Sequence, residues 1–172
     1  MPVTPFHFGP GGLIHALAPR HVSFLSFCAA NVLMDVEPLY FMLTSQYPLH
    51  RFFHTYVGAT IAAIGTVALF TLVLKLASLL RAPDPFHLKR LTLGAIASGA
   101  AIGAYSHILF DSVMHSDIEP FAPFSNWNGL YRIVSLAILH GFCLLAGTIA
   151  TSLIVIRKGM AANQAEKPPW AE

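Results

Sequence analysis

The chain has 172 residues, of which 55% are hydrophobic and only 10% are charged, and its formal net charge is +2. Soluble domains carry about 25% charged residues, so this composition, together with a mean hydropathy of +0.63, excludes an ordinary soluble domain. The small net charge and the absence of a basic run interleaved with aromatic residues exclude nucleic-acid binding.

The hydrophobic residues fall into one short and four long stretches. Residues 9–18 are too few to cross a bilayer and predict a short N-terminal helix that lies at the interface or re-enters the protein. The long stretches each contain the 20 or so mostly apolar residues that a spanning helix needs, and they cover residues 22–44, 55–80, 90–114 and 132–156. The predicted fold class is therefore all-α, a polytopic membrane helical bundle of four transmembrane helices.

Two features set the limits of this bundle. Within the first span, Pro38 follows two acidic residues and predicts a kink or the end of the helix. From residue 159 the chain turns polar and contains prolines, so residues 1–158 are predicted to form one transmembrane domain and residues 159–172 a disordered tail.

The basic residues predict an orientation. One end of the bundle carries only Arg51 and Arg132, while the other carries most of the remaining lysines and arginines, namely Arg20, Arg81, Lys89, Arg90, Arg157, Lys158 and Lys167. The positive-inside rule makes the second end cytoplasmic, with both termini, and the first end outward-facing. His7 would begin at the cytoplasmic end, and it joins the outward histidines only if the short helix re-enters from the far side.

In the third span, His107 and Asp111 are four residues apart and therefore share one helical face. An imidazole nitrogen and a carboxylate oxygen placed in this way can bind one metal ion. Two other roles stay open for Asp111: an acceptor that fixes a histidine tautomer, or half of a simple hydrogen-bonded pair. An ionisable group in a membrane is costly unless paired or ligating, so we favour a functional pair, with His115 extending the stripe.

His50 and His54 precede the second span at the same spacing, and they share a face if the segment is helical. Two neutral imidazoles at this spacing form half of a zinc site, and the alternative is a pair of interfacial histidines. Arg51 between them either meets lipid headgroups or holds a substrate phosphate through its planar guanidinium.

Asp35 and Glu37 are the two carboxylates of the first span. Positions i and i+2 of a helix point apart, whereas a break at Pro38 would let both converge. A charge exposed to lipid costs at least ~2.5 kcal/mol, so we expect one to be a metal ligand and the other a ligand or a general base. Asn31, one turn earlier, is expected to orient Asp35 or to bond a neighbouring helix, and the latter role is also favoured for His140.

Four segments taken in order resemble the YdjM-like family of membrane-bound metal-dependent hydrolases: Thr4-Pro5-Phe6-His7, Leu33-Met34-Asp35-Val36-Glu37, His50-Arg51-Phe52-Phe53-His54-Thr55 and Gly103-Ala104-Tyr105-Ser106-His107-Ile108-Leu109-Phe110-Asp111. The resemblance implies a divalent metal, zinc in the first place, at the surface of a bacterial inner membrane, with hydrolysis as the activity. Glu37 and Pro38 stand where that family often has Asp and His.

More distantly, the order of the ligating residues is similar to that of the all-α zinc-dependent phospholipases C, which implies ligand roles for His7, Asp35, His54, His107, Asp111 and His115. Those enzymes carry a later H-x-x-x-E pair. Leu144 follows His140 at the fourth position here, so a full trinuclear site is not expected.

Together these patterns predict a hydrolase that cleaves an ester or phosphoester of a lipid or a lipid-linked substrate. The metal ligands would come from His7, Asp35, His50, His54, His107, Asp111 and His115, with Glu37 as general base and Arg51 on an anionic group. Two alternatives stay open: a transporter or proton-coupled carrier that uses the same side chains, and a metal-binding membrane protein without catalysis.

Overall fold

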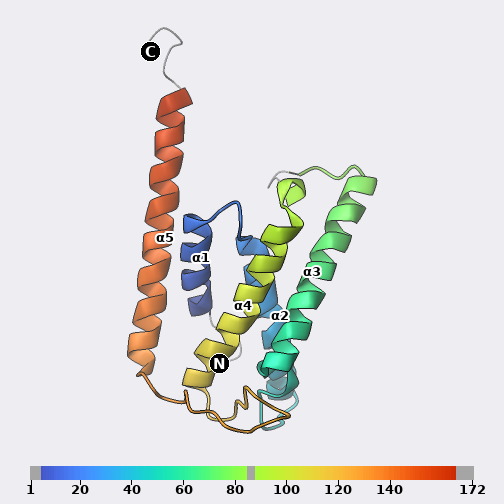
Figure 1. Ribbon diagram of the computed structural model, residues 1–172, viewed down its shortest axis with the longest axis vertical. Coiled ribbons are helices and arrows are strands. Elements are labelled where there is room, and N and C mark those ends of the chain that lie inside the picture. The colour runs from blue at the N-terminus through green and yellow to red at the C-terminus, as the bar shows by residue number, and fades with distance from the viewer. Residues whose placement is uncertain (1–4, 85–87, 166–172) are drawn as a thin grey trace.

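The computed structural model describes residues 5–84 and 88–165 of the chain, and within them it contains helices and no strand. Five α-helices form the fold, with short 3-10 turns at Pro5–His7, Phe52–His54 and Leu88–Arg90 (Figure 1). The α-helices are α1 (Phe8–Leu17), α2 (Phe24–Leu43), α3 (Tyr56–Leu79), α4 (Leu93–Met114) and α5 (Leu136–Ala165).

Four of these helices, α2 to α5, are long and apolar enough to cross a membrane. They alternate in direction, so that α2 and α4 end, and α3 and α5 begin, at the same end of the bundle (Figure 1). The predicted class, four transmembrane helices and a short N-terminal helix, is confirmed.

The first span does not end at Pro38: α2 continues through this residue to Leu43, close to the predicted 22–44, since in an apolar environment helix is the state that satisfies the remaining backbone groups. The predicted tail does not begin at residue 159, because α5 continues to Ala165 through a segment rich in helix-forming residues and free of proline. Residues 166–172 of that predicted tail lie outside the described residues.

α4 packs against both α2 and α3, and it crosses in front of α2 in Figure 1. It approaches α2 closely because small residues face the contact: a Cβ atom on Gly99 would lie 2.2 Å from the carbonyl oxygen of Ser23, and one on Gly103 would lie 2.6 Å from that of Phe27. Such small-residue contacts are a usual way for membrane helices to pack. The buried core around them consists of Ala30, Met34, Ala59, Ala62, Ala63, Ala100, Ala104 and Ile108.

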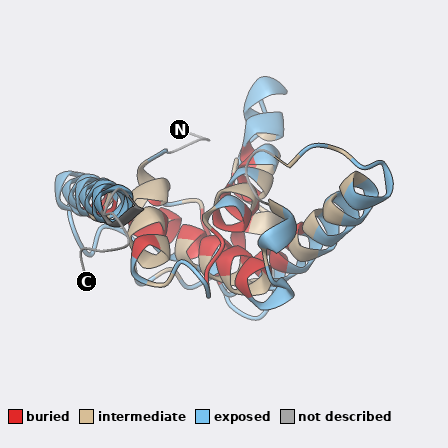
Figure 2. Ribbon diagram, turned by 90° about the horizontal axis from the view of Figure 1, so that it is seen from above, coloured by how far each residue is buried: buried red, intermediate tan, exposed pale blue. Residues whose placement is uncertain are grey.

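α5 lies at the edge of the molecule and is mostly exposed (Figure 2). Its buried stripe, which is Leu139, Cys143, Ala146 and Ala150, faces α1. The two backbones are in close contact, because a Cβ atom on Gly9 would lie 2.0 Å from the carbonyl oxygen of Cys143. At the N-terminal end of α1, Phe6 stacks on His140, with ring centroids 4.4 Å apart. At the C-terminal end of α1, Arg157 donates to the carbonyl oxygen of Ala16.

The contact between α4 and α2 yields a stability prediction. We expect Gly99→Ala to lower the melting temperature of the detergent-solubilised protein by roughly 2–10 °C, because the added methyl group meets backbone atoms that cannot move independently. Gly94→Ala on the same helix is the control, since a Cβ atom there meets nothing within 4 Å. Equal melting temperatures for the two variants would contradict the packing described here.

Candidate metal centre

Four buried side chains meet at the end of the bundle where α2 and α4 terminate. Asp35 comes from α2, His107 and Asp111 from α4, and His54 from the 3-10 turn before α3. One ligand atom from each lies within 4.8 Å of the others, and all four residues are buried. We call these four residues the central group.

The atoms that converge are imidazole nitrogens and carboxylate oxygens. Nε2 of His107 lies 3.4 Å from Oδ1 of Asp35, 3.3 Å from Oδ2 of Asp111 and 3.2 Å from Nε2 of His54. Nε2 of His54 is also 3.6 Å from Oδ2 of Asp111. The i, i+4 pair of α4 therefore meets the other two predicted ligands, and the set offers two nitrogens and two oxygens to a cation.

The charge of this group is compatible with a bound cation. Asp35 and Asp111 are 7% and 3% exposed, and within the described chain their ion pairs are made with histidines and with no lysine or arginine. Burying a carboxylate is costly unless it is paired or binds a metal. Oδ1 of Asp111 additionally lacks a hydrogen-bond donor among the described residues.

The outward-facing nitrogens of the histidines have their own partners. Nδ1 of His107 donates to Oδ1 of Asn31 (3.0 Å), and the Asn31 amide is itself fixed by donating to the carbonyl oxygen of Phe27 (2.8 Å). Nδ1 of His54 has no hydrogen-bond partner among the described residues, and Oε2 of Glu37 lies 3.7 Å from it, within ion-pair distance. The acceptor behind Nδ1 of His107 leaves its Nε2 as the inward lone pair, which is the arrangement seen in metal-ligating histidines.

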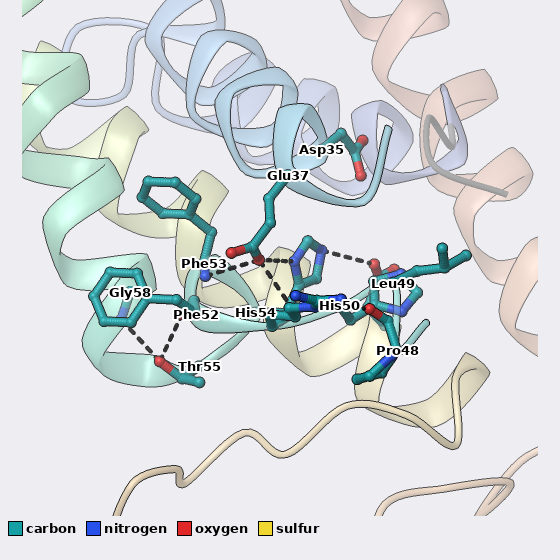
Figure 3. Close-up of polar contacts among 12 residues, drawn as sticks. Asp35, Glu37, Pro48, Leu49, His50, Phe52, Phe53, His54, Thr55 and Gly58 are labelled. Carbon is teal, nitrogen blue, oxygen red and sulfur yellow. Dashed lines mark hydrogen bonds and ion pairs between the residues drawn. The ribbon is translucent and has the colours of Figure 1, made fainter. Parts of the chain in front are cut away.

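Glu37 lies behind His54 and outside the central group (Figure 3). Its Oε2 accepts hydrogen bonds from the backbone N–H groups of Arg51 (3.1 Å) and Phe53 (3.0 Å). Because α2 stays helical, Asp35 and Glu37 keep their i, i+2 separation and face opposite sides of His54. Glu37 thereby holds the turn that carries His54 under the end of α2.

His50 is positioned at the site by tertiary contacts that the sequence does not indicate. The segment from His50 to His54 is not a helix, so the predicted shared helical face is wrong. The two rings are nevertheless in edge contact, with centroids 4.7 Å apart. Asp117 causes this placement, since it accepts the backbone N–H groups of Leu49 and His50 (3.0 and 3.3 Å) and the Nδ1–H of His50 (2.9 Å). Sequence reasoning assigned no role to Asp117.

His7 also belongs to the site. Its Nε2 lies 3.3 Å from Oδ1 of Asp111, and its Nδ1 lies 3.2 Å from Nδ1 of His107. The simple topology that starts residue 7 at the basic end is wrong: α1 starts beside His140 and runs along α5 toward Arg157. His7 is expected to join the other histidines only if the short helix begins at the end of the bundle that carries the site, and α1 begins there.

The two remaining predicted residues lie at the rim. His115 caps the end of α4, and its ring centroid is 4.3 Å from that of His50; with Asp111 these two form a second set of ligand atoms within 4.8 Å of one another. The guanidinium of Arg51 lies 3.6 Å above the ring of Phe41 and lines a pocket of about 530 Å³.

Burial and neighbouring charges act on the pKa values of the groups outside the spans. Burial lowers the pKa values of His7 and His50 to about 4, and it also lowers that of His115, which keeps these imidazoles neutral as metal ligands must be. His54 behaves differently: burial opposes its charged form, but the carboxylates of Asp111 and Glu37 raise its pKa. The centre thus attracts positive charge at the position that a cation would occupy.

His140 does not form the predicted bond between helices, since within the described chain its buried Nε2 has no hydrogen-bond partner and its ring stacks on Phe6. The seven predicted ligands are brought together. Asn31 of α2 bonds His107 of α4, which is the predicted bond to a neighbouring helix and not the alternative in which it orients Asp35. No signal in the sequence identifies the pairing of Asp117 with His50, because it joins two loops that are far apart along the chain.

No known protein family, curated protein or solved structure matches this chain.

Proposed function

We propose that this integral membrane protein is a metal-dependent hydrolase that cleaves an ester or phosphoester of a lipid or a lipid-linked molecule. The observation that carries the proposal is the convergence of Asp35, His54, His107 and Asp111 on one buried point. A set of two imidazoles and two carboxylates suits zinc and other divalent first-row ions.

A bound divalent ion would supply a water whose pKa is lowered toward ~7 and would polarise the oxygen of the scissile ester. Asn31 and Glu37 hold the imidazoles of His107 and His54 in the orientation that binding needs. We assign Glu37 a positioning role instead of the role of general base, because its Oε2 already accepts two backbone N–H groups. Arg51, on the rim pocket, would pair with an anionic group of the substrate.

The depth of the site supports a lipid substrate. Within the four spans the carboxylates are Asp35, Glu37 and Asp111, and all three lie near the end of the bundle where α2 and α4 terminate. A proton or ion relay needs such groups along the whole depth of the membrane, which disfavours the transporter alternative. We propose that this end faces outward from a bacterial inner membrane, since lysine and arginine residues are concentrated at the other end.

The first prediction concerns metal content. Full-length protein purified in detergent after growth with zinc should carry bound metal, and His107→Ala and Asp111→Asn should lose it, because each removes a ligand of the central group. Elemental analysis by mass spectrometry measures the content, with His21→Ala, an exposed histidine outside the site, as control. Wild-type metal content in both site variants would refute the metal centre.

Glu37→Gln separates positioning from general base catalysis. The amide keeps an oxygen for the N–H groups of Arg51 and Phe53 but attracts His54 less strongly. We expect metal affinity to fall by about 10–100-fold, as is usual when a partner behind a ligating histidine is changed. Titration with a competing chelator measures this affinity. Unchanged affinity with abolished turnover would instead make Glu37 the base.

The activity itself is tested on a panel of phosphoesters and lipid esters in mixed micelles. Wild-type protein should hydrolyse at least one class, lose activity on chelation and regain it with zinc. His107→Ala should lower kcat/KM by more than the roughly 10–100-fold that follows loss of an outer partner. Metal-loaded protein that hydrolyses no member of the panel would leave the non-catalytic metal-binding alternative.

A further inference from the structure

The carboxylate of Asp111 faces two groups of imidazoles. Its Oδ2 lies near Nε2 of His54 and His107 (3.6 and 3.3 Å), whereas its Oδ1 lies 3.3 Å from Nε2 of His7 and makes no hydrogen bond among the described residues. Asp111 also belongs to the second set of ligand atoms, with His50 and His115, and these atoms lie within 4.8 Å of one another. One carboxylate is therefore common to both groups.

In the second set, as in the central group, an acceptor behind a histidine ring orients the opposite ring nitrogen toward the other ligand atoms. Nδ1 of His50 donates to Asp117 at 2.9 Å, which leaves Nε2 of His50 as its free lone pair. Two imidazoles and one carboxylate make three protein ligands, which is the number that catalytic zinc sites use when they keep a fourth position open.

The central group and the second set differ in how accessible they are from outside the protein. The four residues of the central group are all buried, with His54 and His107 at most 1% exposed. His115 is half-buried, and His50 and His115 both line a cavity of about 230 Å³ that also includes Ser116 and Tyr131. Asp35, His54, His107 and Asp111 do not line that cavity. A molecule entering through it meets the imidazoles of His50 and His115 first.

We propose that a second divalent cation binds between His50, Asp111 and His115, that it shares Asp111 with the ion of the central group, and that it is the ion in contact with water and substrate. The central group then holds a closed, slowly exchanging ion that fixes Asp111 and the ends of α2 and α4. This inference rests on the proposed metal centre but does not depend on hydrolysis.

The test uses the full-length protein in detergent, loaded with Zn²⁺ and freed of excess metal. Elemental analysis should find two ions per chain, and a chelating dye should extract one rapidly and the other slowly. His115→Gln and His50→Gln should each keep one ion and lose the rapid phase. Retention of the slow ion shows that the variant is folded, and His21→Gln, outside both groups, should keep two ions.

One ion or none in the wild-type protein, or two ions in both variants, would overturn the inference. Loss of both ions from both variants at unchanged melting temperature would also overturn it, because the two sets would then form a single site. Failure of the proposed function looks different. Two ions with a rapid phase but no turnover would refute hydrolysis alone, whereas turnover with a single ion would refute the second site alone.

Discussion

The carboxylate of Asp111 is the group around which the rest of the site is organised. It is nearly fully buried in a membrane-spanning helix, where an uncompensated charge is costly. The chain surrounds it with imidazoles that come from the residues before α1, from the loop before α3 and from α4 itself. Segments distant in sequence thus meet at this side chain, because its buried charge has to be balanced by a protonated imidazole or a metal ion.

A further set of acceptors directs the imidazoles. Asn31, Glu37 and Asp117 each stand on the far side of a different ring, and each is tied to backbone N–H or carbonyl groups at the same time. Ring orientation and backbone path are therefore fixed by the same side chains. This explains how an irregular loop presents His50 and His54 to the site without the regular spacing of a helix.

The parts of this structure that depend on local pattern could be predicted from the sequence, and those that depend on tertiary contacts could not. Span lengths and the shared face of His107 and Asp111 follow from helix geometry. The return of His7 to the site depends on how α1 packs on α5, and the placement of His50 depends on Asp117, 67 residues away. The continuation of α2 through Pro38 agrees with the predicted span and contradicts only the alternative of an end at this residue, since a proline rule weighs local cost and not the apolar surroundings.

Because α1 is short, α5 has a structural role beside it. A ten-residue helix is about 15 Å long, roughly half the thickness of the hydrocarbon core, so α1 is too short to cross it and its backbone has to be covered by other parts of the protein. α5 covers its first turn through the contact of Gly9 with Cys143 and the stack of His140 on Phe6. α5 contributes no ligand, and its role is therefore to shield from lipid the segment that carries His7.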